Sequence, residues 1–247
     1  MVQNKKTSNP KKKEKSISLE DTIIYKEIQT RNLRLLITAI ILLVIGILSL
    51  IPVIFDRSIF FLIVAGIFLA ISVYQFVLTF RRNENIFNHP DMNHFLGWGE
   101  EYGNYVISMD DELKENKKTE FSHAFFTDSF VFVPTFYRFN WFHFSEVCWA
   151  FNHVTQNSVN FVPTGKDYAV HVYLDNGSVV QIKSDSSGDI LNHLVKTAPF
   201  AHYGYSDELK NEWSNDTANF INSVKHRMQQ FFKNPDKFIK DNFDVEE

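Results

Sequence analysis

Few residues in this chain have the types and spacing that chemistry requires. Pro163-Thr164-Gly165-Lys166 contains the Gly-Lys pair of a phosphate-binding loop, but the first glycine of that loop is missing. Asp110, Asp111 and Glu112 are adjacent, so on a helix they cannot converge as a general acid/base pair. We interpret them as a solvated helix face. The sequence therefore predicts no catalytic residues and a protein that is not an enzyme.

Metal and cofactor sites have equally little support in the sequence. The nine histidines form no His-Glu-x-x-His motif, and His143 and His153 have no third ligand at a suitable spacing. His171 falls within an expected strand, where ordinary packing explains it. Cys148 is the only cysteine, which excludes a disulfide framework and a cysteine-built metal site and fits a reducing compartment. We predict no metal and no cofactor.

A block of aromatic residues is the remaining candidate for a functional surface. Six of the nine positions from Phe136 to Phe144 are aromatic. Because the faces of a strand alternate, these side chains cannot all enter one small core. Two interpretations stay open: the block is the core of a β domain, or part of it contacts a protein partner or the bilayer interface. The candidate surface residues are Phe136, Tyr137, Arg138, Phe139, Trp141, Phe142 and Phe144.

An apolar stretch, interrupted only at Asp56-Arg57, must position the rest of the chain. The charge-free runs on either side, 35–55 and 58–80, hold 21 and 23 residues. As helices they reach about 31 and about 34 Å, enough for a hydrocarbon core of about 30 Å. The short turn between them predicts a membrane hairpin over residues 18–82. Gly66 and Ala70 form a small-xxx-small pair where the two helices could approach closely.

The positive charges predict the orientation of this hairpin. Residues 1–34 hold nine Lys and Arg residues, whereas the turn between the runs holds only Arg57. The positive-inside rule then places both termini in the cytoplasm, as in a multi-pass protein of a bacterial inner (plasma) membrane. Residues 81–247 carry a net charge of −9, which argues against nucleic-acid binding, because phosphates demand a basic face.

The chain beyond the hairpin divides by composition. We expect a disordered Lys-rich leader at 1–17, a helical connector at 83–118, a β domain with a closing helix at 119–200, and C-terminal helices at 201–247. Asp175-Asn176-Gly177 separates two strand-like runs, and Asn-Gly predicts a hairpin with a type I′ turn. The fold class is therefore α+β, with a helical hairpin followed by an antiparallel β domain and C-terminal helices.

Four short segments of the chain are Leu96-Gly97-Trp98-Gly99, Ile107 to Leu113, Glu146-Val147-Cys148-Trp149-Ala150 and Gly204-Tyr205-Ser206. With these segments the chain resembles a group of uncharacterised bacterial membrane proteins, which have two N-terminal spans and a cytoplasmic pleckstrin-homology-like domain. The resemblance covers most of residues 85–215 and implies fold and topology, with no established activity. Lipid-binding pleckstrin-homology domains have a Lys/Arg-rich pocket, whereas only Lys166 and Lys183 stand in the corresponding region here.

Two functions fit these expectations. The first is a non-enzymatic, membrane-anchored scaffold that presents its domain to a protein partner at the cytoplasmic face, while the two spans contact the lipid bilayer. The second is an accessory subunit of a transporter or other membrane complex, packing through its hairpin. The sequence leaves the partner and the oligomeric state open.

Overall fold

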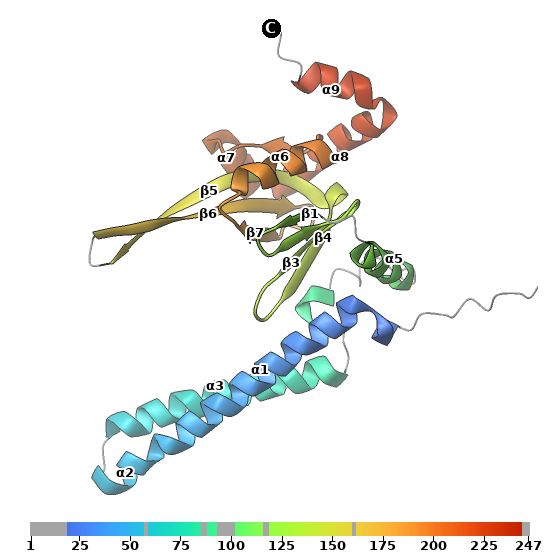
Figure 1. Ribbon diagram of the computed structural model, residues 1–247. Helices are drawn as coiled ribbons and strands as arrows, with labels where there is room; N and C mark the ends of the chain where they lie inside the picture. Colours follow the sequence, from blue (N-terminus) through green and yellow to red (C-terminus); the bar gives the residue numbers. More distant parts are fainter. Residues whose placement is uncertain are drawn as a thin grey trace, which may run out of the picture.

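The computed structural model describes residues 19–56, 59–84, 88–92, 102–115, 119–159 and 162–243. Within these ranges the chain is an α+β protein, in which two long apolar helices precede two sheets and a set of C-terminal helices (Figure 1). The predicted leader at 1–17 and the segment Leu96-Gly97-Trp98-Gly99 lie outside the described residues.

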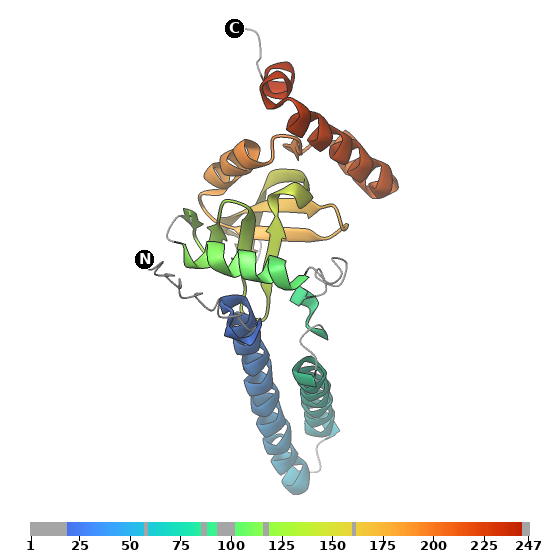
Figure 2. The same cartoon turned by 90° about the vertical axis from the view of Figure 1, so that its right-hand side faces the viewer.

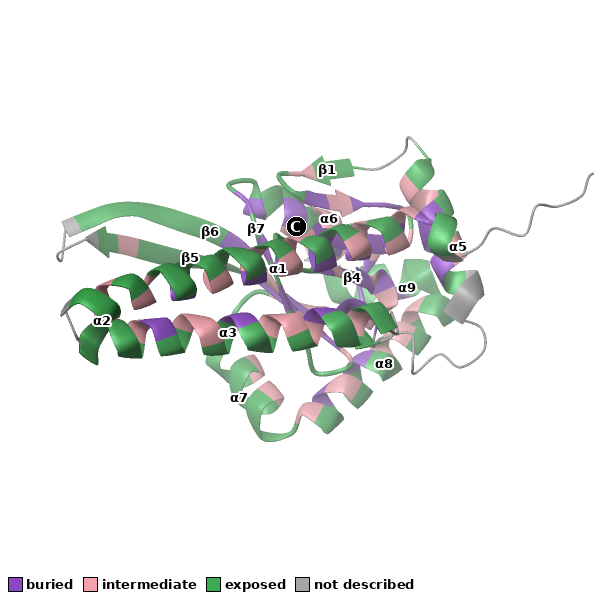
Figure 3. Ribbon diagram, turned by 90° about the horizontal axis from the view of Figure 1, so that it is seen from below, coloured by how far each residue is buried: buried purple, intermediate pink, exposed green. Residues whose placement is uncertain are grey.

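The apolar hairpin consists of α1 (Ile23–Leu48), the short α2 (Leu50–Asp56) and α3 (Ile59–Glu84), after the 3-10 turn η1 (Leu19–Asp21). Thr22 caps α1 by accepting the N–H of Tyr25 at 3.2 Å, so the helix begins well before the charge-free run. Both long helices are apolar and long enough to cross a membrane, and their sides are largely exposed (Figure 3).

The two long helices pack as antiparallel neighbours. Ser72 Oγ donates to the carbonyl of Ala39 at 2.8 Å, and the Asn32 amide donates to the Asn83 side chain near the other end. The helices also approach each other closely at Gly46, because a Cβ there would lie 3.0 Å from the side chain of Leu69.

The predicted contact at Gly66 and Ala70 is wrong. A Cβ at Gly66 would have no neighbouring atom within 4 Å, and Ala70 is exposed. The antiparallel register instead turns Ala65 and Ser72 toward α1, so the small residues that permit close packing lie on a different face of α3.

Two sheets follow the hairpin. The first has the order β1-β2-β3-β4 and the second the order β7-β6-β5-β8, in which only β8 runs parallel to its neighbour. The strands are β1 (Thr119–Phe121), β2 (Ala124–Phe126), β3 (Phe130–Pro134), β4 (Phe139–His143), β5 (Val147–Val159), β6 (Val162–Leu174), β7 (Val179–Lys183) and β8 (His202–Tyr203).

The predicted hairpin between β6 and β7 is confirmed, but its turn is not of type I′. The N–H of Gly177 bonds to the Leu174 carbonyl at 2.9 Å, and the N–H of Leu174 bonds to Ser178 at 2.9 Å. Gly177 has a φ of 80°, whereas Asn176 is not among the residues with positive φ. The loop is therefore one residue longer than a type I′ turn, with glycine alone in the left-handed position.

Two apolar cores lie on opposite faces of the first sheet. Val131, Val133 and Phe142 face the second sheet, where they join Val147, Val170 and Ile190 among others in the larger core. Phe130, Phe132 and Trp141 face the other way, toward Ile24 and Ile28 of α1. Strands β2 and β3 are therefore buried on both faces, which is why nearly every position in them is apolar.

Two connector elements complete the cover of that outer face. They are η3 (Pro90–Met92) and α5 (Tyr102–Lys114), which contribute Met92, Val106 and Met109 to the smaller core. Figure 2 shows α5 lying across the sheet, between the domain and the hairpin. The connector is thus part of the packed structure as well as a link.

The C-terminal helices close the larger core from the other side. They are α6 (Ser187–Thr197), α7 (Asp207–Asn215), α8 (Thr217–Lys233) and α9 (Pro235–Phe243). Ser206 caps α7 by accepting the N–H of Leu209 at 3.1 Å, and Asp216 caps α8. Phe220 and Val224 of α8 are buried in the same core as β5 and β6.

Candidate functional site

The structure divides the predicted aromatic surface into two parts. Phe139 and Trp141 are buried in the smaller core against α1 and α5, and Phe142 and Phe144 are buried in the larger one. The sequence argument allowed for one core only, whereas the sheet is covered on both faces. The other three residues, Phe136, Tyr137 and Arg138, are exposed in the turn between β3 and β4.

This turn is a four-residue loop closed by hydrogen bonds between Thr135 and Arg138. The N–H of Thr135 bonds to the Arg138 carbonyl at 2.7 Å, and the Thr135 hydroxyl accepts the N–H of Arg138 at 3.0 Å. The rings of Phe136 and Tyr137 meet edge to face with centroids 4.7 Å apart. Two aromatic side chains and one guanidinium are thereby presented at the tip of the β3–β4 hairpin, which points toward α1 (Figure 1).

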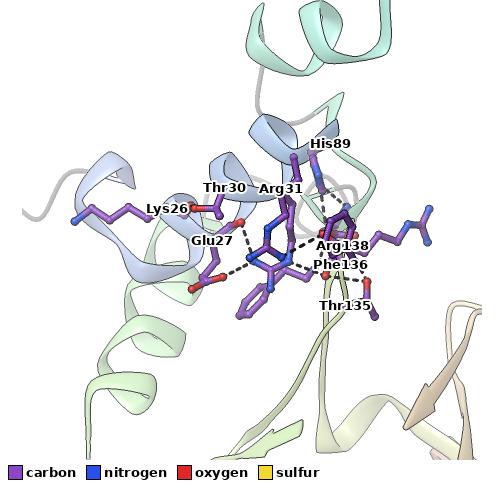
Figure 4. A network of polar contacts seen from close by, with 11 residues as sticks. Lys26, Glu27, Thr30, Arg31, His89, Thr135, Phe136 and Arg138 are labelled. Atoms are coloured by element: carbon purple, nitrogen blue, oxygen red, sulfur yellow. Dashed lines mark hydrogen bonds and ion pairs between the residues drawn. The ribbon is translucent and has the colours of Figure 1, made fainter. Parts of the chain in front are cut away.

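Arginines of α1 hold the tip in place (Figure 4). Arg31 Nε donates to the Arg138 carbonyl at 2.8 Å, and its Nη1 donates to the carbonyl and the carboxylate of Glu27. The Arg31 guanidinium lies 5.0 Å from the centre of the Phe139 ring. Arg34 bonds to the Phe136 carbonyl at 3.4 Å. Because Arg31 is almost fully buried, these bonds fix the orientation of the domain on the hairpin.

Asp91 ties the connector to the same place. Its carboxylate accepts the N–H of Phe139 at 2.6 Å, and its carbonyl accepts the indole N–H of Trp141 at 2.9 Å. Burial raises the pKa of Asp91, although the bond from Phe139 and the charges of Arg138, Arg82 and Arg31 act in the opposite direction. We call the region around Arg31, Asp91 and the β3–β4 turn the junction.

His89 lies beside Asp91 in the junction. Its Nδ1 accepts the N–H of Asp91 at 3.2 Å, and the ring is almost fully buried. Burial lowers the pKa of His89 to about 4, and the charges of Arg82, Arg138 and Arg31 act in the same direction. The imidazole is therefore neutral at physiological pH.

The free edges of the two sheets differ in how they are protected. The outward N–H groups of Phe139 and His143 on β4 are taken by the carboxylates of Asp91 and Glu146, at 2.6 and 2.7 Å. These side chains cap the edge, so no further strand can pair there without displacing them.

The edge of β7 carries no such caps in the part of the chain that the structure describes. The N–H of Ser184 bonds to the Tyr168 carbonyl of β6 at 3.1 Å. Every second residue of a strand pairs to the same side, so the N–H groups of Val180 and Ile182 also point toward β6. The N–H groups of Val179, Gln181 and Lys183 therefore point outward. A groove of about 420 Å³ runs along this edge and is also lined by Val133, Pro134 and Asn140 of the first sheet.

Two of the adjacent acidic residues are not the solvated face that the sequence predicted. Asp110 is buried and accepts the N–H of Ile23 at the start of α1, while pairing with Lys114. Glu112 accepts from the Thr127 hydroxyl at 2.6 Å and from Ser129 N–H at 3.0 Å. Both have structural roles, because they satisfy backbone and hydroxyl donors at the ends of neighbouring elements.

The remaining chemical groups do not converge. His153 and His171 lie with ring centroids 4.8 Å apart on the β5–β6 ribbon, but no group of three or more metal-ligating side chains exists among the described residues. Burial raises the pKa of Cys148 to about 12, so its thiol is unreactive at neutral pH.

Comparisons with known proteins add nothing to this geometry. No family model, curated protein or solved structure matches the chain. The junction and the β7 edge are therefore the candidate functional features of the described residues.

Sequence reasoning missed the residues that build these two features. Arg31 and Asp91 act through contacts with strands far away in the chain, and nothing in their spacing indicates those contacts. Glu146 lies three residues from its partner His143, so the local spacing of a capping box is the signal that could have indicated it. The β7 edge could have been found in part, because Val179, Gln181 and Lys183 alternate with buried residues.

Proposed function

We propose that this protein is a non-enzymatic, membrane-anchored interaction protein whose hairpin spans the cell membrane with both termini in the cytoplasm. The exposed apolar surface of the hairpin supports insertion, because a soluble protein rarely leaves so many large apolar side chains in water. The concentration of Lys and Arg before α1 supports the orientation.

We propose further that the sheets and α6 form a pleckstrin-homology-like domain. The strand order supports this, with a four-stranded antiparallel sheet followed by the antiparallel strands β5, β6 and β7 and then a helix that contacts β5 and β6. β8 and the helices α7 to α9 are additions to that plan.

The observation that carries the proposal is the buried junction. Ile24 and Ile28 of α1 pack under Phe132 and Trp141, so the first helix of the hairpin is also a structural layer of the domain. A membrane partner would meet the β7 edge at a fixed height and orientation, which raises its effective concentration relative to a freely jointed domain.

The mode of binding that fits this edge is strand addition. An extended segment of the partner would pair with the outward groups of Val179, Gln181 and Lys183, and its side chains would enter the groove. Main-chain bonds supply affinity in this mode, and the groove supplies specificity.

The test is the variant Gln181→Pro. It is made in the full chain, because a truncation that removes α1 would uncover Phe130, Phe132 and Trp141. Proline removes the outward N–H of this edge residue and leaves the bonds to β6 intact. After crosslinking in the native membrane, we expect partner recovery to fall at least about tenfold. Gln181→Thr, the matched control, retains the N–H and should recover the partner as wild type does.

Equal recovery by the proline and threonine variants would contradict strand addition. Recovery that instead depends on the lipid-facing side of the hairpin would favour the accessory-subunit function. Polar substitution of Ile40 and Ile41, both exposed on α1, separates that outcome from the proposed one.

A further inference from the structure

The groove along the β7 edge is basic, although the chain around it is acidic. Its charged lining residues are Lys183 of β7 and Arg138 of the β3–β4 turn, and His123 is a further group that gains positive charge on protonation. Among the described residues that line the groove there is no Asp or Glu. Residues 81–247 hold 24 Asp and Glu against 15 Lys and Arg, so the carboxylates of the domain lie elsewhere.

Both basic side chains of the groove can meet a partner. Lys183 and Arg138 are exposed. Neither of them belongs to an ion pair within 4 Å in the part of the chain that the structure describes. Their positive charges are therefore available to a group of opposite charge.

Two carboxylates lie in adjoining hollows, and each has other contacts there. Asp91 lines the first hollow, where its carboxylate is buried and accepts the N–H of Phe139 at 2.6 Å. Glu120 lines the second, together with Arg31 and Arg34. Neither carboxylate lines the groove itself, so the two basic residues remain open to a carboxylate of a partner.

The two faces of β7 determine the pattern of a strand that pairs with it. Val180 and Ile182 are buried, whereas Gln181 and Lys183 are exposed. A paired strand continues both faces, because its side chains alternate in the same way. Its inner residues would meet apolar groups of the groove such as Val133, and its outer residues would lie beside Gln181 and Lys183. Opposite charges on neighbouring strands attract, so acidic residues are favoured at the outer positions.

The charge also argues against a second copy of this edge as the occupant. A copy that paired through its own β7 would bring its Lys183 and Arg138 into the same groove. Like charges on neighbouring strands oppose pairing, so the occupant that fits is a segment of another protein with the opposite charge.

We propose that the segment that adds to β7 is acidic. It alternates apolar residues on its inner face with Asp or Glu on its outer face, and Lys183 and Arg138 recognise its carboxylates. This inference rests on the strand addition proposed above and gives the partner its chemical class.

Two synthetic peptides long enough to cover β7 test the inference. One alternates Val with Glu and the other alternates Val with Lys, and both carry a fluorophore and blocked ends. Fluorescence anisotropy measures their binding to the full chain in nanodiscs of phosphatidylcholine, a lipid without net charge. We expect wild type to bind the Val/Glu peptide at least about tenfold more tightly than the Val/Lys peptide.

The double variant Arg138→Glu/Lys183→Glu should reverse this order. Its fold should be unchanged, because both side chains are exposed and the junction uses only the backbone groups of Arg138. Lys237→Glu/Lys240→Glu on α9 changes the net charge equally, and neither residue lines the groove. This control should keep the wild-type order. Thermal unfolding of both double variants should match that of wild type.

The outcomes separate the acidic partner from strand addition itself. Failure of wild type to bind the Val/Glu peptide overturns the inference, as does an unreversed order in Arg138→Glu/Lys183→Glu or a reversed order in the α9 control. If Gln181→Pro weakens both peptides equally and wild type does not distinguish them, strand addition holds and only the acidic partner is wrong. Binding that follows charge but is unchanged by Gln181→Pro overturns strand addition, and with it the inference that rests on it.

Discussion

Glu146 accepts the N–H of His143 at 2.7 Å and so caps the short 3-10 turn η5 (Phe144–Glu146) as well as the edge of β4. Burial raises the pKa of this carboxyl to about 7, with Asp175 acting in the same direction and the bond from His143 against it. A group chosen for capping thus titrates near neutrality because of where the fold places it.

Burying the ionised Glu146 carboxylate costs free energy, so replacing Glu146 should change the stability of the protein in a pH-dependent way. The pKa of Glu146 in the folded state lies above the ordinary value of 4.5. The protonated carboxyl therefore contributes its full stabilisation of the fold below pH 4.5, and this stabilisation is lost as the pH rises to 7. Glu146→Gln keeps an oxygen acceptor for His143 and cannot ionise. We expect it to be more stable than wild type by about 2–3 kcal/mol at pH 8 and nearly equal at pH 4.5.

Chemical unfolding of the domain in detergent, followed at both pH values, measures the difference. Glu120→Gln on the exposed strand β1 is the control and should differ from wild type equally at both. If the difference in free energy of unfolding between Glu146→Gln and wild type did not grow with pH, burial would not be what raises the pKa of Glu146.

At the scale of elements, the two glycines of the hairpin lie in opposite surroundings. Gly46 of α1 has room for no side chain, because an added Cβ would meet Leu69 at 3.0 Å, whereas Gly66 of α3 faces open space. The two glycines therefore differ in their tolerance of a larger side chain, because they lie on different faces of the helix pair.

Gly46→Ile should therefore destabilise the helix pair by about 1–3 kcal/mol, as overpacking does elsewhere. Gly66→Ile places the same side chain where nothing is displaced and should leave stability within about 0.5 kcal/mol of wild type. Thermal unfolding in matched micelles compares the two. If Gly66→Ile proved the more damaging, the observed register of α1 and α3 would be wrong.

At the scale of the whole molecule, orientation in the membrane is open to a direct chemical test. Cys148 is buried and its raised pKa makes it inert, so single added cysteines can be labelled without removing it. We expect an impermeant thiol reagent outside intact cells to label Ser58→Cys and to miss Ser214→Cys, which is exposed on α7. Lysed cells provide the control, in which Ser214→Cys must react.

Labelling of Ser214→Cys in intact cells would reverse the proposed orientation. It would also place the β7 edge outside the cell, and with it any partner that binds there.

The sequence alone determined the features that depend on local pattern. Charge-free runs of 21 and 23 residues predicted the two apolar helices, and Asp175-Asn176-Gly177 predicted the β6–β7 hairpin. In each case neighbouring residues carry the physical cause, which is apolar length for the helices and backbone freedom at Gly177 for the turn.

Only the tertiary structure decided how the aromatic block is used. Phe139 and Trp141 are core residues because Ile24 and Ile28, more than a hundred residues earlier, cover the second face of their sheet. No local pattern encodes that cover, since alternation in a strand shows which residues share a face and not what lies against it. The same long-range packing leaves Phe136, Tyr137 and Arg138 exposed at the tip of the β3–β4 hairpin.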